Sequence, residues 1–235
     1  MTTATFPYIC LEMDPLVGSK TREINQALKV GTKQSQSHAA AEALSLAIES
    51  IVEGVVQSLF QDLSSAYPDN KLYRVALKVS KEIHGKILTY LEWLTKFLSN
   101  ERLGVVTSWY LSLFQAVNNQ ATAREFLVVQ LKPELAGKAR RTIDDLRSGK
   151  SKDLDAGVEM LIEIVDELLE PFVYEPKRLM KFNLVVSKTL DGIIYMIKSL
   201  SYRELRTFAK HLPPDHLPII LTHLEKNFRD SSHPV

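Results

Sequence analysis

The sequence predicts an all-α protein, a bundle of about seven or eight helices packed around one core. Apolar residues recur at spacings of three and four in most windows, as on one face of a helix. No window shows the sustained apolar-polar alternation of a half-buried strand. A long helical pattern at residues 71–94 also returns in similar form at residues 178–201. We therefore expect a wholly helical body organised around these two segments.

The two similar segments suggest an internal duplication. At an offset of 107 residues, the identical pairs are Leu72/Leu179, Leu77/Leu184, Val79/Val186, Ser80/Ser187, Lys81/Lys188, Gly85/Gly192 and Ile87/Ile194. The apolar side of each segment covers more than half of the helix, which favours a central position for both. The alternative interpretation is a chance resemblance between two apolar helices of similar composition.

The narrow polar face of both segments is basic and contains a glycine at the same point, Gly85 and Gly192. Glycine inside a helix costs about 0.5–1 kcal/mol relative to alanine, so its repetition predicts close approach by another backbone or a ligand. This face is our candidate site for an anion or an acidic partner. Its candidate residues are Arg74, Lys78, Lys81, Lys181 and Lys188.

Composition places the chain among ordinary globular proteins. At 235 residues it is long enough for a substantial core. Cys10 is the only cysteine, and no secretory leader pattern begins the sequence, so we expect a cytoplasmic protein. The net charge of +1 argues against bulk attraction to nucleic acid or membranes. Acidic and basic blocks alternate along the chain, and we expect them to neutralise one another.

We expect an extended N-terminal arm at residues 1–36, where Pro7, Pro15 and Gly18 interrupt any periodicity. Residues 37–150 should form a first helical half and residues 151–235 a second, together making one compact unit.

Capping and turn residues divide the first half into helices. The sequence predicts helices at residues 37–63 and 71–94, with Asn70 capping the second, and an uncharged helix at 101–118. The spacing of Thr122 and Glu125 resembles a capping box and predicts a further helix. Pro133 should restart that helix, which we expect to reach Leu146.

The second half should begin with an acidic helix capped by Asp153. The second long helix should start near Pro176 and pack against the acidic helix, as 71–94 should pack against 37–63. The spacing of Ser201 and Glu204 predicts a separate short helix, followed by a last helix from His216.

Polar residues on the uncharged helix form one narrow stripe that includes Ser108, Ser112 and Gln115. Such a stripe could line a small-molecule pocket and orient a ligand by hydrogen bonds. Alternatively, the serines hydrogen-bond back to the preceding turn and let neighbouring helices approach closely.

No spacing typical of catalytic or metal chemistry is present. None of the six histidines stands three residues after a glutamate, and His216 and His223 are too far apart on a helix to bind one ion. Gly149, Lys150 and Ser151 lack the earlier glycine and preceding strand of a phosphate-binding loop. We therefore expect no catalytic residues, no metal and no cofactor.

Two further partner classes are disfavoured. The last helix has few side chains that could read base edges, so we expect no sequence-specific nucleic-acid binding. The uncharged stretch at residues 103–123 is too polar for lipid, so we expect no transmembrane segment.

The leading hypothesis is a non-enzymatic helical interaction or scaffold module that binds a protein partner or a second copy of itself. The alternative is a helical small-molecule binder or enzyme, with a pocket at the uncharged helix 101–118.

Overall fold

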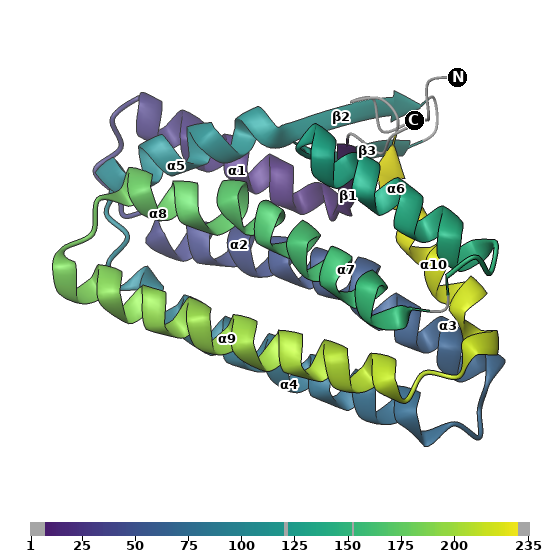
Figure 1. Ribbon diagram of the computed structural model, residues 1–235. Coiled ribbons are helices and arrows are strands. Elements are labelled where there is room, and N and C mark those ends of the chain that lie inside the picture. The colour runs from purple at the N-terminus through teal and green to yellow at the C-terminus, as the bar shows by residue number, and fades with distance from the viewer. Residues whose placement is uncertain (1–7, 120–121, 152, 230–235) are drawn as a thin grey trace.

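The computed structural model describes residues 8–119, 122–151 and 153–229. These residues form an all-α helical bundle, as the sequence predicts, with one small antiparallel sheet that it does not predict (Figure 1). The α-helices are α1 (Pro15–Lys29), α2 (Ser37–Ile51), α3 (Ser58–Ala66), α4 (Lys71–Thr95), α5 (Asn100–Leu113), α6 (Pro133–Arg147), α7 (Leu154–Leu169), α8 (Glu175–Met180), α9 (Leu184–Lys210) and α10 (Leu217–Glu225). Short π-helical or 3₁₀ segments are η1 (Val52–Gln57), η2 (Glu170–Tyr174) and η3 (Pro214–His216).

The sheet has the strand order β2-β3-β1-β4. Its strands are β1 (Tyr8–Met13), β2 (Phe114–Asn119), β3 (Thr122–Gln130) and β4 (Phe228–Arg229). The central strand β1 pairs antiparallel with both β3 and β4, so it ties the start of the chain to its end. The prediction of an extended arm at residues 1–36 is wrong at α1, which is helical, whereas residues 8–13 are extended and pack on the core as a strand of the sheet.

The sequence did not predict these strands, for two physical reasons. In β1, Ile9, Leu11 and Met13 face the core, but the other face also holds the apolar Tyr8 and Cys10 beside the exposed Glu12, so the sequence shows little alternation. In β3, the β-branched and aromatic run around Phe126 and Val129 outweighs the capping-box spacing that predicted a helix. The uncharged helix accordingly ends at Leu113, and β2 follows it.

The main core lies where the sheet meets α6, α7 and α10. Its centre is small and tightly packed, with Ala136, Ala139 and Ile143 of α6 fully buried. Gly18 of α1 is required by this packing, because a Cβ atom there would lie 1.6 Å from the Glu125 carboxylate oxygen Oε2. The buried Glu125 carboxylate thus lies directly against the α1 backbone.

The two long helices α4 and α9 are neighbours but lie at the periphery, as an antiparallel outer layer (Figure 1). Among its residues α4 buries only Tyr73, and α9 buries Val186, Leu190 and Ala209. The prediction that both helices are central is therefore wrong. The predicted partners are confirmed, since α4 packs on α2 and α3 while α9 packs on α7.

The start of the second long helix also differs from the prediction. Lys181 has a left-handed backbone with φ 47°, and Asn183 caps a new helix by accepting a hydrogen bond from the Val186 N–H. The segment similar to the start of α4 is thus divided between α8 and α9. No break occurs near Ser201, where α9 continues.

The duplicated glycines do not mark a close approach within the chain. A Cβ atom at Gly85 or Gly192 would meet nothing within 4 Å. Both glycines are exposed on the outer layer, so this prediction finds no support inside the molecule.

By length and composition, one helical stretch among the described residues, Ser37–Ala66, could cross a membrane. It is not the uncharged stretch considered from the sequence. One stretch of this kind is by itself weak evidence for a membrane span. Its most apolar window is only 11% buried, although its first part, α2, packs against α1, α4 and β1.

Candidate functional site: the outer face of α4 and α9

The acidic helix α7 lies between two sets of basic residues, and its carboxylates are paired with them. On one side, Lys138 Nζ lies 2.6 Å from Glu163 Oε1. Next to this pair, Lys132 Nζ lies 2.7 Å from Glu167 Oε2. On the other side, α9 provides a lysine and an arginine. These pairs are Lys198 with Asp166 at 2.5 Å and Arg206 with Glu159 at 2.7 Å. The acidic block is thus neutralised within the chain, as expected from the sequence.

The electrostatics agree with this pairing. Burial by itself would raise the pKa of Asp166, but the ion pair with Lys198 and the hydrogen bond from Tyr202 outweigh it and lower that pKa. The hydrogen-bonded Arg206 guanidinium lowers the pKa of Glu159. Both carboxylates therefore stay ionised at neutral pH and hold α9 against α7.

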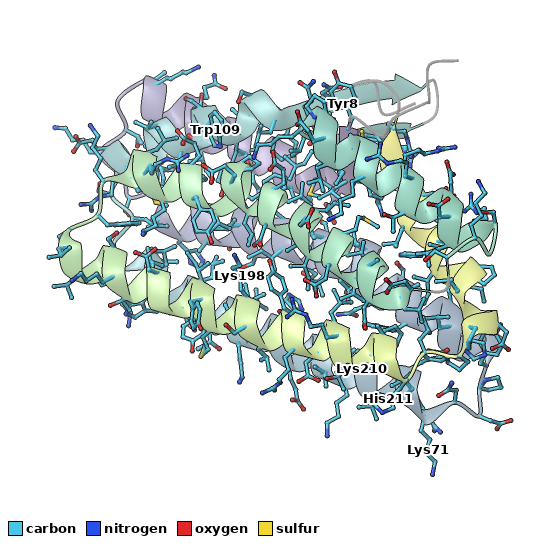
Figure 2. All side chains as sticks on the ribbon, in the orientation of Figure 1. Tyr8, Lys71, Trp109, Lys198, Lys210 and His211 are labelled. Carbon is cyan, nitrogen blue, oxygen red and sulfur yellow. The ribbon has the colours of Figure 1, made fainter. Side chains whose placement is uncertain are left out.

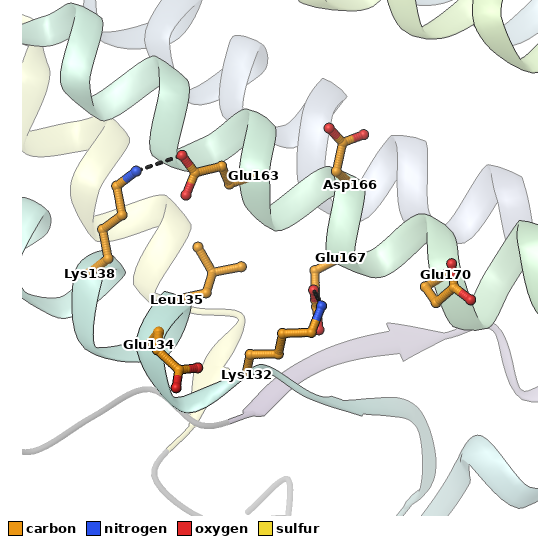
Figure 3. A pocket seen from close by; sticks show the side chains of 8 residues that line it. All are labelled: Lys132, Glu134, Leu135, Lys138, Glu163, Asp166, Glu167 and Glu170. Carbon is orange, nitrogen blue, oxygen red and sulfur yellow. Dashed lines mark hydrogen bonds and ion pairs between the residues drawn. The ribbon is translucent and has the colours of Figure 1, made fainter.

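A groove of about 550 Å³ runs between α6 and α7 (Figure 3). Its lining residues are Lys132, Glu134, Leu135, Lys138, Glu163, Asp166, Glu167 and Glu170. Two of its carboxylates, those of Glu163 and Glu167, accept hydrogen bonds from the lysines that face them across the groove. Within residues 8–119, 122–151 and 153–229, no group of three or more His, Cys, Asp or Glu side chains could hold a metal ion. The groove is a salt-bridged surface between two helices.

The outer layer has the opposite electrostatic character. Lys78 has only a long ion pair with Glu82, at 4.0 Å. Among the described residues, several other cations of this layer have no carboxylate partner. They are Lys71, Arg74, Lys81 and Lys86 on α4, Lys188 and Lys210 on α9, and Lys181 just before α9. Figure 2 shows the contrast, because Lys198 lies between α9 and α7 whereas Lys71 points away from the body.

The structure places the five predicted cations on this one layer but in two groups. The contact of 3.9 Å between Tyr90 Oη and Met196 Sδ fixes the antiparallel register of α4 and α9. Counting from this contact at 1.5 Å per residue, Lys78 and Lys188 are roughly 30 Å apart along the layer. Arg74 and Lys81 lie near Lys78, and Lys181 lies near Lys188. The five residues therefore form an extended surface and cannot all bind one small anion.

Exposed apolar side chains accompany these cations, a feature that the sequence analysis missed. Their exposed fractions are 57% for Val75, 69% for Leu184, 75% for Val185, 74% for Tyr195 and 40% for Met196. Helical periodicity places Leu184, Val185 and Tyr195 on the side of α9 away from the buried Val186 and Leu190, but only the packing shows that this side has no neighbour. We call the surface formed by these cations and these exposed apolar side chains the outer face.

The predicted pocket residues do not form a pocket in the part of the chain that the structure describes. Ser108 and Ser112 are exposed, and their hydroxyls donate hydrogen bonds to the carbonyls of Gly104 and Trp109. Ser108 also accepts a hydrogen bond of 2.7 Å from the Asn25 amide. Gln115 lies on β2, outside the helix. The alternative interpretation, serines bonded to the preceding turn, describes the observed geometry.

Two histidines are buried and tie the last helix to the rest of the bundle. His216 is hydrogen-bonded through Nδ1 to the Tyr73 hydroxyl and stacks on Tyr67, with ring centroids 3.3 Å apart. The Nε2 atom of His223 lies 3.0 Å from the Val55 carbonyl oxygen in η1. Burial raises the pKa of Tyr73 to about 12. These contacts are structural, and the sequence-based view of surface or interface histidines understated their burial.

Comparison with protein family models, curated proteins and solved structures found no match to this chain.

Proposed function

We propose that this protein is a non-enzymatic helical binding module whose working surface is the outer face of α4 and α9. The observation that carries the proposal is the contrast in pairing. The cations facing α7 have carboxylate partners, whereas seven cations of the outer layer have none among the described residues. Unpaired charge at the surface is available to a partner, and a row of it selects for an acidic one.

The exposed apolar residues support the same surface. Single exposed apolar residues are common on proteins, but a group of them on one helix face is typical of a binding site. Tyr195 and Met196 belong to residue types enriched at interfaces. Exposed glycines at positions 85 and 192 would also let a partner approach the helix backbone closely.

The order of elements is compatible with duplication, which we include in the proposal. A helix, a π-helical segment, a short helix and a long helix follow one another twice, as α2-η1-α3-α4 and as α7-η2-α8-α9. An ancestral helical hairpin, doubled, would present its two long helices side by side on one face.

A small-molecule binder or enzyme centred on helix 101–118 is the less favoured function. Its candidate hydroxyls are already hydrogen-bonded to backbone carbonyls, and their side chains face solvent. We also propose a cytoplasmic location, for which the buried free thiol of Cys10 is suitable.

Site-specific photocrosslinking in native cells tests this function. A photoreactive amino acid replaces Tyr195 on the outer face, and in a matched control it replaces Val30, which is 78% exposed and lies at the end of α1. We expect ultraviolet-induced adducts at position 195 and none at position 30. Equal yields at both positions, or adducts at position 30 alone, would contradict the proposal.

A further inference from the structure

We infer that the partner of the outer face is an anionic lipid membrane, on which α4 and α9 lie flat. This inference rests on the proposed function, because it names the chemistry that the same face recognises. Three features of the outer face favour lipid over an acidic protein.

The first feature is the type of cation. Six of the seven unpaired cations of this layer are lysines, and only Arg74 is an arginine. Arginine is favoured where a planar carboxylate is held by two hydrogen bonds, whereas lysine acts as a mobile point charge. Protein interfaces are accordingly depleted in lysine. A lysine-rich face suits a diffuse layer of headgroup charge.

The second feature is the mixture of these lysines with exposed aliphatic and aromatic side chains. Lys188 lies on the same side of α9 as Leu184, Val185 and Tyr195. Helices that lie in the membrane interface combine such apolar groups with lysine, because the apolar groups enter the acyl boundary while the ammonium groups stay among the headgroups.

The third feature is shape. The two helices have 25 and 27 residues, so each is about 40 Å long. The groove between α6 and α7 and the smaller one between α1 and α5 both lie outside this face. A long paired-helix face suits a flat surface better than it suits an inserted peptide.

Flotation of the full-length protein with vesicles tests the inference. The probes are vesicles of phosphatidylcholine alone and of phosphatidylcholine with 30% phosphatidylserine. We expect binding to the anionic vesicles, weakening as salt rises, and at least tenfold weaker binding to the neutral ones.

Two matched variants locate the binding surface. The outer-face variant carries Lys71→Gln, Arg74→Gln, Lys81→Gln and Lys86→Gln. The control variant carries Lys29→Gln, Lys33→Gln, Arg141→Gln and Lys150→Gln, which remove the same charge from exposed positions outside α4 and α9. Since each basic residue near an anionic surface strengthens binding about fivefold, the outer-face variant should bind at least 100-fold more weakly. The control should stay within about threefold of the parent protein, by the same electrostatic argument.

A third variant tests the apolar contribution. Leu184→Ser, Val185→Ser and Tyr195→Ser keep every charge, and all three side chains are exposed, so the fold should be retained. We expect at least tenfold weaker binding to anionic vesicles. Circular dichroism and urea unfolding, unchanged from the parent, establish that each variant is folded.

The possible outcomes separate the two proposals. Equal binding to neutral and anionic vesicles, or equal loss in the outer-face and control variants, would overturn the lipid inference. A protein adduct at position 195 without vesicle binding would also overturn it, while leaving the proposed function intact. Absence of both vesicle binding and adducts would overturn both.

Discussion

The helices α7 and α4 are both long, amphipathic and strongly charged on one side, yet they occupy different places in the molecule. The acidic α7 buries five residues and is flanked by α6 and α9, whose basic side chains neutralise it. The basic α4 buries Tyr73 alone and directs its cations to solvent. Charge on α7 is therefore paired within the fold, whereas most of the charge on α4 is exposed to solvent.

This difference shows that the charge pattern of a sequence can be interpreted only when the neighbours of each helix are known. Both helices have charged residues at spacings of three and four, which in sequence look alike. The neighbours on either side decide whether each charge is paired. An exposed ion pair contributes about 0–1 kcal/mol, so the pairs around α7 orient helices more than they stabilise them.

The largest expected effect concerns burial. Ile164 on α7 is 4% exposed and Val75 on α4 is 57% exposed. We expect Ile164→Ala to lower the free energy of unfolding by about 2–5 kcal/mol, and Val75→Ala to change it by less than about 0.5 kcal/mol. Urea unfolding of both variants measures this. Equal losses would mean that α4 is a core helix after all.

The second prediction concerns Tyr73, which anchors α4. Its pKa is raised to about 12 from an ordinary value of 10, so the folded state retains the hydroxyl proton to higher pH than the unfolded chain does. Stability should therefore be insensitive to this group below pH 10 and fall as the pH rises from 10 to 12. The expected loss at pH 12 is about 2 kcal/mol.

Unfolding titrations of the parent protein and Tyr73→Phe isolate this contribution. Other tyrosines with raised pKa, Tyr110 and Tyr202, are common to both proteins and cancel in the difference. The variant should lose less stability between pH 10 and 12. Parallel curves would show that the Tyr73 hydroxyl does not titrate differently on unfolding.

The third prediction concerns the pairing of α7 with α9. A double-mutant cycle with Asp166→Asn and Lys198→Met should give a coupling of about 0.2–1 kcal/mol at neutral pH. Because the pKa of Asp166 is lowered by folding, this stabilisation is present above its ordinary pKa and is lost as the pH falls below about 4. A coupling that persists at pH 2 would contradict the ion pair.

The last prediction is a small gain in stability. A Cβ atom at Gly85 has open space around it, so Gly85→Ala should stabilise the free protein by about 0.5–1 kcal/mol. Thermal unfolding measures this. A destabilised variant would show that the space around Gly85 is occupied in solution.

The sequence allowed the fold class and several element boundaries to be predicted. Asn70 and Asp153 cap α4 and α7, as their positions before apolar runs indicated. The pairing of α4 with α2 and α3, and of α9 with α7, was also predictable from the similarity of the two segments.

The sheet and the position of the long helices were not predictable in the same way. A short strand such as β1, which has apolar residues on both faces, has too little alternation to distinguish it from an irregular apolar segment. Leu184 and Val185 look like core residues in sequence, and only the packing shows that their side of α9 has no neighbour. Arg74, Lys78, Lys81, Lys181 and Lys188 are exposed, and their division into two groups required the antiparallel register of α4 and α9.

The most direct test of the whole account is lysine acylation of the full-length protein, followed by mass spectrometry, with and without phosphatidylserine vesicles. The account predicts that vesicles slow labelling of Lys71, Lys81, Lys86 and Lys188, while Lys29, Lys33 and Lys150 react at unchanged rates. Uniform protection of all these lysines, or none on the outer face, would contradict it.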